Sequence, residues 1–366
     1  MDSFKGSLTA VDACNAVFEG IKSYASEVML VPMADGGEGT TNSIVRATDG
    51  FLSECEASGV FGEKINGYYG VINNDTAIVE TAVASGITLV PKEKLNPLLA
   101  TTMGMGEIIK SVLDKGYKKI IVGLGGSATN DGGMGALMAL GVRFFDEDNN
   151  SLFGCGENLI KIRSINADNI IGKDAEIILA CDVKNPFYGE NGAAYVYGRQ
   201  KGADTKMLKI LDDGLRNFSE VLKRQFNVDI SEIPGAGAAG GLAGGLLALT
   251  NAKIESGFKI ISEITALSEK IKECDLVITG EGMTDYQTAF GKLPSGIGLI
   301  AKEYNKPVIL ISGSVMPDSV NLYASGITAM FSIINKPLSL AEAMRDAYDL
   351  LKAASENAIR LFLGKV

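Results

Sequence analysis

The sequence predicts an α/β protein with a parallel, doubly wound sheet, and three observations support this fold class. Short apolar runs end in glycine-rich loops and are followed by helical patterns, as in βα units. The C-terminal third alternates such runs, at residues 276–279, 308–311 and 327–331, with helices after Ser295 and Leu338. With 366 residues, 46% of them apolar, the chain can bury a large core, and its length suggests two domains.

The composition excludes several classes of function. The net charge of −10 argues against a nucleic-acid partner, which basic patches would bind. The sequence has no 18-residue apolar run and no signal peptide, so we expect a soluble, cytoplasmic protein without a membrane partner. Histidine is absent, which rules out serine–histidine and cysteine–histidine hydrolase mechanisms within this chain. The five scattered cysteines form no CxxC, and we expect neither a disulfide framework nor a zinc site.

The N-terminal elements come first in the chain. Residues 2–7 form a loop that carries Lys5 and precedes a helical pattern, with Ser7 as a candidate N-cap. Residues 28–31 predict a short strand that leads into a loop with Asp35 and Glu38, and then a helix over 42–46. The first and last thirds are expected to share one sheet, which divides the chain into residues 1–48 plus 265–366 and an inserted domain of residues 49–264.

The inserted part contains the most informative stretch. Residues 51–82 alternate with a period of two and predict an antiparallel meander, and residues 101–116 predict a helix. Residues 120–122 then predict a buried strand, after which small and polar residues follow until a helix begins near Met134. These residues are Gly125, Gly126, Ser127, Thr129, Asn130 and Asp131. A strand, a glycine-rich turn and a helix together present backbone N–H groups to an anion such as a phosphate.

Two later strands end in similar polar loops. Residues 176–180 lead to Asp182 and Asn185, with Lys201 further on, and residues 276–279 lead to Glu281 and Asp285. In parallel sheets such loops gather at the carboxyl ends of the strands, where ligands bind. Acidic residues beside phosphate-binding glycines suggest Mg²⁺ and phosphoryl transfer, in which a carboxylate accepts the proton of the attacking hydroxyl group. The Walker sequence GxxxxGK[ST] is absent.

Residues 235–240 match the G-x-G-x-x-G pattern, and Glu255 follows Gly235 by twenty residues. A dinucleotide site needs a firm strand before this pattern, and residues 228–233 are polar and weak as a strand. Close packing of a small-residue helix start, a second phosphate-facing helix N-terminus and an NAD(P)-dependent oxidoreductase therefore all stay open.

Ten motifs, in order, resemble those of bacterial type I glycerate kinases. They are DSFKGSL, PMADGGEGT, ETAVASGITLVP, NPLLATT, GLGGSATNDGG, CDVKNP, ENGAA, QKGAD, PGAGAAGGL and ITGEG with its DYQT and GK continuation. The resemblance implies ATP- and Mg²⁺-dependent phosphorylation of D-glycerate to 2-phosphoglycerate. It also implies two α/β domains, one Rossmann- or flavodoxin-like and the other inserted, with the site between them.

The resemblance also implies roles for individual residues. Asp182 is the first candidate for the catalytic base, since partial burial at a strand end raises the pKa of a carboxylate, and Asp131 is the second. Lys5, with Ser3 nearby, is expected to bind phosphate or the glycerate carboxylate. The other expected binding residues are Gly125, Gly126, Ser127, Thr129, Asn130, Asn185 and Lys201 for phosphate or substrate, Asp35 and Glu38 for orienting Lys5 or holding metal, Glu281, Gln287 and Lys292 for the nucleotide, and Asp285 with Asp131 for the metal.

The sequence departs from the family pattern at two places. The short apolar strand and the proline that usually precede DSFKG are missing, so we expect the first strand to be missing and the true start to lie upstream. Met283 stands where the family commonly has an arginine, which would weaken substrate binding or alter the substrate. An inactive relic of the kinase that only binds a small hydroxy acid is therefore a further alternative, and a homodimer is an open expectation.

Overall fold

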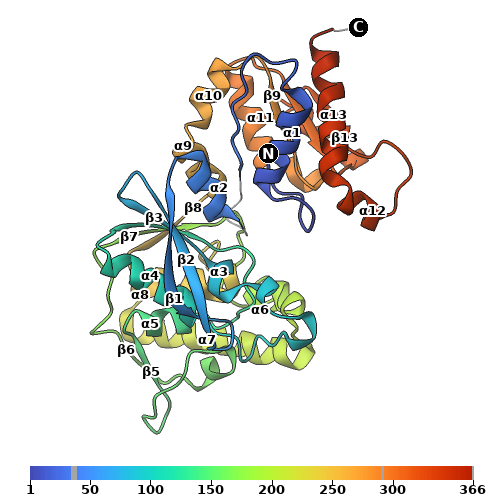
Figure 1. Ribbon diagram of the computed structural model, residues 1–366. Helices are drawn as coiled ribbons and strands as arrows, with labels where there is room; N and C mark the ends of the chain where they lie inside the picture. Colours follow the sequence, from blue (N-terminus) through green and yellow to red (C-terminus); the bar gives the residue numbers. More distant parts are fainter. Residues whose placement is uncertain (34–38, 290–291, 365–366) are drawn as a thin grey trace. The chain divides into compact units, whose positions relative to one another are not determined.

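The computed structural model describes residues 1–33, 39–289 and 292–364, and the chain divides into two compact units (Figure 1). The predicted site residues Asp35 and Glu38 lie outside the described residues. Unit 1 comprises Met1–Asp35, Arg46–Thr48 and Phe258–Val366, and unit 2 comprises Gly36–Val45 and Asp49–Gly257. Within the described parts of the chain, no helix has the length and the apolar character needed to span a membrane.

Unit 2 is built on a six-stranded mixed sheet in the order β1-β2-β3-β4-β7-β8. Its strands are β1 (Phe51–Ser58), β2 (Lys64–Ile72), β3 (Thr76–Glu80), β4 (Lys119–Gly123), β7 (Glu176–Ala180) and β8 (Ala252–Glu255). β1, β2 and β3 pair antiparallel, and β3, β4, β7 and β8 pair parallel. The predicted meander is therefore confirmed, and it continues into the parallel part of the same sheet. The carboxyl ends of four parallel strands lie at one edge.

Helices cover both faces of this sheet. They are α2 (Thr40–Ala47), α3 (Thr81–Ser85), α4 (Met103–Asp114), α5 (Met134–Ala139), α6 (Ala193–Tyr197), α7 (Thr205–Phe226) and α8 (Leu242–Leu249). Successive side chains of β2 point to opposite faces, so Gly67 and Gly70 face different helices. A Cβ atom at Gly67 would lie 3.2 Å from Ile108 of α4, and one at Gly70 would lie 2.6 Å from Val45 of α2. Both glycines let a helix approach the strand closely.

Shorter elements complete unit 2. They are the pair β5 (Arg143–Phe145) and β6 (Ser164–Asn166), and the 3₁₀ helices η1 (Ile87–Leu89), η2 (Lys92–Lys94), η3 (Gly156–Lys161), η4 (Arg199–Lys201) and η5 (Ala238–Gly241). One large apolar core lies between the sheet and the helices α4, α5, α7 and α8. It includes Ile108, Ile120, Leu215 and Phe218. Burial of this apolar surface is the main force that holds the strand ends in place.

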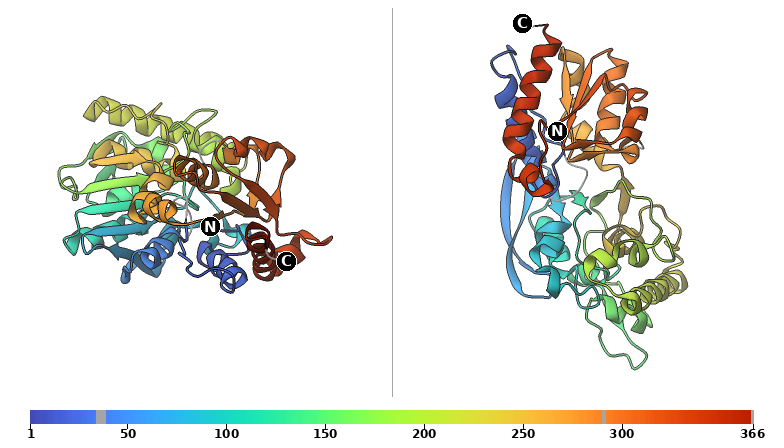
Figure 2. Two further views of the ribbon diagram at one scale, coloured as in Figure 1. Left: turned by 90° about the horizontal axis from the view of Figure 1, so that it is seen from above. Right: turned by 90° about the vertical axis from the view of Figure 1, so that its right-hand side faces the viewer.

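Unit 1 contains a three-stranded parallel sheet in the order β13-β11-β9. Its strands are β9 (Val277–Thr279), β11 (Val308–Ser312) and β13 (Ala329–Ser332), with a small parallel pair of β10 (Met283–Thr284) and β12 (Ser314–Val315). Its other elements are α1 (Ala10–Ile21), α9 (Gly257–Ile264), α10 (Leu267–Glu273), η6 (Tyr286–Ala289), α11 (Leu293–Glu303), η7 (Pro317–Tyr323), α12 (Leu340–Arg345) and α13 (Ala347–Phe362). The sheet lies between α13 and α11 (Figure 2). The prediction of an α/β fold with a doubly wound parallel sheet is confirmed.

The helices α1 and α13 lie side by side in unit 1 (Figure 1). A Cβ atom at Gly20 of α1 would lie only 2.4 Å from the carbonyl oxygen of Lys352 in α13, so glycine permits this close approach. The apolar residues of both helices share a core with Ile309 and Ile311 of β11. The two ends of the chain are thus joined in one unit, which is the reason that the middle of the sequence is inserted.

The predicted strand over residues 28–31 is wrong, because residues 27–33 form neither helix nor strand. The backbone of Met1 lies beside this segment, with Met33 N–H donating to Met1 O at 2.9 Å and the Met1 ammonium donating to Val31 O at 3.3 Å. On the other side, Asp2 N–H donates to Gly280 O at 2.9 Å.

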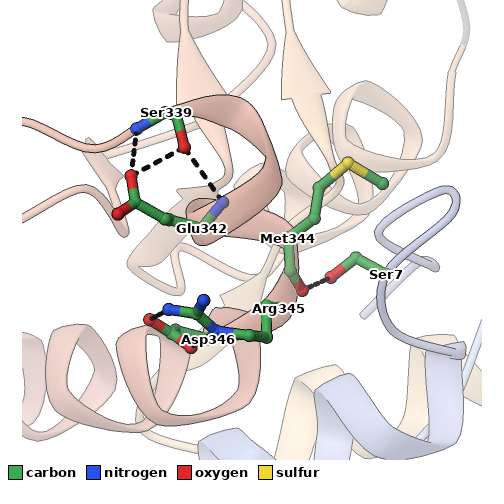
Figure 3. A network of polar contacts seen from close by, with 6 residues as sticks. All are labelled: Ser7, Ser339, Glu342, Met344, Arg345 and Asp346. Atoms are coloured by element: carbon green, nitrogen blue, oxygen red, sulfur yellow. Dashed lines mark hydrogen bonds and ion pairs between the residues drawn. The ribbon is translucent and has the colours of Figure 1, made fainter.

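The predicted N-cap of α1 is also wrong. Thr9, not Ser7, caps this helix, and its hydroxyl oxygen accepts from Asp12 N–H at 3.1 Å. Ser7 Oγ instead donates to the carbonyl oxygen of Met344 at 2.7 Å (Figure 3). Met344 belongs to α12, whose first turn is closed by a capping box between Ser339 and Glu342. The loop that carries Lys5 is therefore attached to the C-terminal part of unit 1.

Candidate functional site

The glycine-rich loop that follows β4 runs from the surface into the interior of unit 2. Gly126 is exposed and has a φ angle of +73°, Ser127 is 8% exposed, and Thr129 is completely buried. Ala128 N–H donates to Ser85 O at 2.8 Å, which attaches the middle of the loop to the end of α3. A positive φ angle favours glycine, so the loop geometry explains one of the glycines that the sequence analysis singled out.

The buried side chain of Lys201 forms hydrogen bonds with two residues of this loop. Lys201 is the last residue of η4 and is only 2% exposed, and its Nζ donates to Ser127 Oγ at 2.8 Å and to the carbonyl oxygen of Thr129 at 2.6 Å. Burial lowers the pKa of Lys201 to about 7, and the negative charge of Asp131 opposes this shift. The lysine predicted to bind phosphate or substrate therefore positions the loop that carries the other predicted phosphate-binding residues.

Asp131 lies at the buried end of the loop and is fully enclosed. Its Oδ2 accepts from Thr102 N–H and Thr102 Oγ1, both at 2.8 Å, and from Gly135 N–H at 3.2 Å, while its Oδ1 accepts from Gly133 N–H at 3.1 Å. Burial raises the pKa of Asp131, and these donors oppose the shift. Because its oxygens already accept four bonds, the geometry favours a structural role that joins the starts of α4 and α5 over the predicted roles of base and metal ligand.

Two side chains of the loop carry buried polar atoms that form no hydrogen bond with any described residue. The hydroxyl group of Thr129 and both amide atoms of Asn130 have no hydrogen-bond partner within the described chain, and both residues are 0% exposed. Leaving a buried polar group unpaired costs about 1–3 kcal/mol, so native proteins rarely keep such groups without a water, an ion or a ligand to bind. The two residues predicted to contact phosphate and substrate thus have unused bonding capacity.

The second glycine-rich stretch packs directly against this loop. Gly240 has a φ angle of +68°, and a Cβ atom there would lie 2.0 Å from the carbonyl oxygen of Thr129. Gly132 N–H donates to Gly240 O at 3.0 Å. Residues 227–237 contain neither helix nor strand, so the pattern over residues 235–240 lacks the strand that a dinucleotide site requires. The close packing that was one of the three interpretations is therefore present, the strand that an NAD(P) site requires is missing from these residues, and a phosphate-facing role of this helix start stays a prediction.

Asp182 follows β7, which pairs with β4 in the sheet. The side chain is exposed, so the partial burial that we expected for it is wrong. Its Oδ1 accepts from Ser256 Oγ at 2.7 Å and from Gly257 N–H at 3.1 Å. These donors lie at the start of α9, where the helix dipole stabilises a negative charge. Asp182 is thus an accessible carboxylate held at a fixed place on the ligand-binding edge of the sheet.

Asn185 in the same loop is engaged with the protein itself. The backbone carbonyl oxygen of Asn185 accepts from Gly235 N–H at 3.2 Å and from Gly237 N–H at 3.1 Å. Its side chain accepts from Tyr197 Oη at 2.6 Å and donates to Asn191 O at 2.8 Å. This predicted substrate-binding residue therefore connects its own loop to α6 and to the stretch at Gly235–Gly237, and its bonds favour an indirect role.

Glu80 was missed by sequence reasoning. It ends β3, is 2% exposed, and accepts from Gly39 N–H at 2.7 Å and from Thr41 N–H at 3.1 Å. It therefore holds the start of α2, directly after the loop with Asp35 and Glu38. The signal was present in the sequence, because a carboxylate ends an apolar run of the kind that predicts a buried strand.

In unit 1, Lys5 lies at the exposed tip of a tight turn. Phe4 N–H donates to Leu8 O at 2.9 Å and Ser7 N–H donates to Phe4 O at 2.8 Å, which closes the turn. A Cβ atom at Gly282 would lie 3.3 Å from Lys5 N, so the Gly280–Gly282 loop passes directly beside the turn. The predicted residue Ser3 lies two residues before Lys5, and its N–H donates to Asp2 Oδ1 at 2.6 Å.

The loop after β9 brings further predicted residues together. Glu281 is 7% exposed, and its Oε1 accepts from Thr288 Oγ1 at 2.8 Å and Thr284 Oγ1 at 3.0 Å. Burial raises the pKa of Glu281, and these two hydroxyl groups oppose the shift. Asp285 Oδ1 lies 3.7 Å from Lys292 Nζ. Gln287 belongs to η6, and its side chain lies outside what the structure describes.

Met283, where the family commonly has an arginine, is 53% exposed. Its backbone pairs with Ser314 in the small β10–β12 sheet, next to Glu281. The position is therefore accessible to a ligand, but its side chain offers no positive charge. The departure from the family pattern falls on an exposed side chain of the candidate site and not on a core residue.

A divalent metal has few ready-made ligands in the described chain. The described residues contain no cluster of three or more Asp, Glu, Cys or His side chains that could hold one. Mg²⁺ needs no such cluster, since it commonly keeps several waters and binds one or two carboxylates and the phosphates of the substrate. The exposed Asp182 and the partly buried Asp285, whose side chain is 18% exposed, each fit this description better than the fully enclosed Asp131 does.

A surface hollow of about 650 Å³ lies elsewhere on unit 2. It is lined by Lys118, Lys119, Asp174 and Glu176 among others, at the amino ends of β4 and β7. This is the edge of the sheet opposite to the glycine-rich loop, and no predicted site residue lines the hollow. Ligands of parallel sheets bind at the carboxyl ends of the strands, so we assign no role in the reaction to this hollow.

Comparison with known proteins gives consistent matches over nearly the full chain. The family model described as the glycerate kinase family matches residues 1–363. A glycerate 2-kinase of Escherichia coli strain K12 is 42% identical over 365 residues, which cover 97% of this chain and 95% of that protein. A glycerate kinase of Haemophilus influenzae is 42% identical over 370 residues, covering 100% of this chain and 98% of that protein.

One solved structure is similar throughout. It belongs to a protein of Salmonella typhimurium LT2 that is assigned as glycerate kinase 2, and it matches with a TM-score of 0.86 and 38% sequence identity. The match covers 99% of this chain and 96% of that chain. The fold of both units is therefore shared with a protein of known structure.

Proposed function

Because the chain belongs to the glycerate kinase family, we propose that it transfers the terminal phosphoryl group of ATP to the 2-hydroxyl group of D-glycerate. The membership makes it an ATP-dependent kinase that acts on an alcohol group. The 2-position, the catalytic residues and the magnesium requirement are parts of the proposal.

One observation carries the proposal more than any other. The glycine-rich loop after β4 is fixed by the buried ammonium group of Lys201, and it keeps unpaired polar atoms on Thr129 and Asn130. Phosphoryl transfer requires mainly positioning and electrostatic stabilisation of the phosphate oxygens. A rigid loop with backbone N–H groups, hydroxyl groups and a cation nearby supports this role. In the proposal, Gly125, Gly126, Ser127 and Thr129 bind phosphate oxygens, and Asn130 contacts the acceptor.

Asp182 is the proposed base. It is exposed, it lies at the carboxyl end of the strand next to β4, and its Oδ1 is held by Ser256 and Gly257. A base must be able to reach the hydroxyl proton of the acceptor. Asp131 does not meet this condition, since it is enclosed and its oxygens accept four bonds. We therefore keep Asp182 and give Asp131 a structural role.

In the proposal, charged side chains of unit 1 bind the oxyanions of the substrates and the metal ion. The exposed ammonium groups of Lys5 and Lys292 attract phosphate or carboxylate oxygens. Asp285 is a candidate ligand for Mg²⁺, which would neutralise negative charge on the phosphates when bound. Glu281 fixes the turn over Thr284 and Thr288 that carries Asp285.

A coupled assay tests the proposal. The purified protein is mixed with D-glycerate, ATP and MgCl₂, ADP release is followed, and enolase without phosphoglycerate mutase identifies the product. We expect ADP release that depends on D-glycerate and a product that enolase converts directly. A product that enolase accepts only after the mutase is added would place the phosphate on the 3-hydroxyl group.

The alternative of a relic that binds without transfer is favoured by one feature, the exposed Met283 in place of an arginine. Thermal protection by D-glycerate or ATP without any ADP release would support that alternative. Met283→Arg separates the two further. If the missing charge limits catalysis, this variant gains activity, and if the chain is a relic, it does not.

A further inference from the structure

The buried ammonium group of Lys201 has an unusual set of partners. A buried lysine normally has a carboxylate at ion-pair distance. Across the described chain, no carboxylate forms such a pair with Lys201, and its hydrogen bonds go to Ser127 Oγ and Thr129 O. Asp131, the nearby negative charge, directs its oxygens to four other donors. The chain thus keeps a buried cation whose bonded partners are both in the loop.

The bond to Ser127 fixes the direction of a hydroxyl proton. When Lys201 carries its proton, its ammonium group can only donate, so Ser127 Oγ accepts from it and the hydroxyl hydrogen has to point to a different partner. In the part of the chain that the structure describes, no group accepts this hydrogen. Ser127 is 8% exposed and lies between the exposed Gly126 and the buried Ala128. The O–H bond is therefore available at the point where the loop enters the interior.

We propose that Lys201 is a positioning residue that orients the Ser127 hydroxyl group as a hydrogen-bond donor to an oxyanion of the substrates. The proposal rests on the proposed kinase function. The ligand class is a phosphate or carboxylate oxygen, since both accept from a hydroxyl group and both occur in the substrate pair. A hydroxyl group that accepts from a cation becomes a stronger donor, because the bonds in such a chain polarise one another.

If Lys201 orients Ser127, substitutions of these two residues change the kinetics in a different way from the substitution of a lysine that only fills space. Lys201 contributes to ligand binding only through Ser127, so the loss of either residue removes the same oxyanion contact. The effects of Ser127→Ala and Lys201→Met are then non-additive, as for groups that act as one unit. A lysine that only fills space affects stability instead, and its effect on catalysis adds to that of Ser127.

The experiment is a double-mutant cycle with steady-state kinetics. We expect Ser127→Ala and Lys201→Met each to lower kcat/KM by about 10- to 100-fold, the effect of losing a hydrogen bond to a charged group. The double variant is expected to lose no more than the larger single effect. Ser127→Thr keeps the hydroxyl group and retains activity within about threefold, far from the loss expected for a charged hydrogen bond. Arg199→Met is the matched control, because it removes an exposed cation from the same turn.

Separate measurements with ATP and with D-glycerate identify the oxyanion. A change confined to kcat/KM for ATP assigns the contact to a phosphate. A change confined to kcat/KM for D-glycerate assigns it to the carboxylate. Additive effects in the cycle, or unchanged kcat/KM in folded Ser127→Ala, overturn the proposal. If Lys201→Met does not fold, the comparison of Ser127→Ala with Ser127→Thr still decides, because equal activities of these two variants overturn it.

Calorimetric titration distinguishes this proposal from the proposed function. Inorganic phosphate, ATP and D-glycerate are titrated into the wild-type protein and the same variants. If the wild type transfers no phosphoryl group but Ser127→Ala and Lys201→Met weaken the same ligand equally, the oxyanion contact stands and the kinase function fails. If the wild type is active and neither variant changes any affinity or rate, the kinase function stands and the contact is refuted.

Discussion

The loops after β4 and β7 leave neighbouring strands at the same edge of one sheet, yet they present their aspartates in opposite ways. Asp131 is completely buried and accepts four hydrogen bonds, whereas Asp182 is exposed and its Oδ1 accepts from two donors at the start of α9. The sequence pattern of strand, polar residues and glycine is similar in both. The difference shows that a strand end fixes where a carboxylate lies, and that the surrounding donors decide whether it can exchange a proton.

The largest effect is expected from Asp182→Asn. The amide oxygen still accepts from Ser256 and Gly257, so the start of α9 keeps its cap, but the side chain can no longer take a proton. We expect kcat to fall by about 10²- to 10⁴-fold, the range for loss of a general base. The free energy of unfolding is expected to change by less than about 1 kcal/mol. Steady-state ADP release and urea denaturation of the same sample measure both effects. An active Asp182→Asn would remove Asp182 as the base.

Asp131→Asn is expected to act on stability instead. The NH₂ group of the asparagine would face N–H donors that now meet a carboxylate oxygen, so the N–H groups of Thr102 and Gly135 would lose the oxygen that accepts their hydrogen bonds. Breaking such a buried, charged network costs on the order of 3–5 kcal/mol. Urea denaturation followed by circular dichroism measures the loss. A variant of unchanged stability with no activity would show that Asp131 acts in catalysis and that the contrast between the two loops is false.

The sequence predicted these loops because a strand followed by glycines and polar residues is a local pattern. Residues 120–122 and 176–180 are strands as expected, and both loops begin where the apolar runs end. The partners of the loop residues are distant in sequence, since Thr102 is 29 residues from Asp131 and Lys201 is 74 residues from Ser127. Only the packed fold brings them together, so local spacing could not show that Asp131 is saturated or that Lys201 supports the loop.

Two other differences have a similar cause. The predicted strand over residues 28–31 is wrong, because a strand requires a ladder of backbone bonds to a neighbour, and residues 27–33 bond only to the backbone of Met1 and form no strand in the described chain. The glycines over residues 235–241 could be interpreted as a dinucleotide motif until the packing of Gly240 on Thr129 was visible. Glu80 could have been found, because a carboxylate at the end of an apolar run is visible in the sequence.

Gly240→Ala tests how tightly the β4 loop is supported. The added Cβ atom would lie 2.0 Å from Thr129 O, and the φ angle of +68° disfavours any residue with a side chain. Overpacking and the left-handed backbone together are expected to cost about 2–4 kcal/mol of unfolding free energy. Gly116→Ala is the matched control, because Gly116 has a φ angle of +89° and nothing within 4 Å. Thermal unfolding of both variants shows the difference, and equal losses would mean that packing on Thr129 contributes nothing.

The titration of Lys201 gives the stability of the β4 loop a dependence on pH. The pKa of Lys201 is about 7 in the folded protein, below the ordinary value of 10.5, so the unfolded chain binds more protons between these values. Stability therefore rises with pH in this window, by up to about 1.4 kcal/mol per pH unit for one group. Compared with Lys201→Met, we expect the wild type to gain up to about 2 kcal/mol from pH 7 to 9. Parallel pH curves of the two proteins in urea denaturation would contradict this.

The smallest effect on stability is expected from Thr129→Val, and it is the sharpest test of which loop atoms serve the ligand. Thr129 Oγ1 has no partner in the described structure, so replacing the hydroxyl by a methyl group is expected to leave the free energy of unfolding unchanged or to raise it by up to about 1 kcal/mol. Tyr69→Phe is the matched control, because the Tyr69 hydroxyl group is also buried and unpaired but belongs to the core beside Tyr117. Melting curves with and without MgATP and D-glycerate separate the two. Only Thr129→Val should lose thermal protection by the ligands. If the Thr129 hydroxyl group bonds a ligand, its removal lowers the stability of the liganded protein and not that of the free protein. Equal protection in both variants would mean that this hydroxyl group belongs to the packing of the loop and that the β4 loop holds its ligand by other atoms.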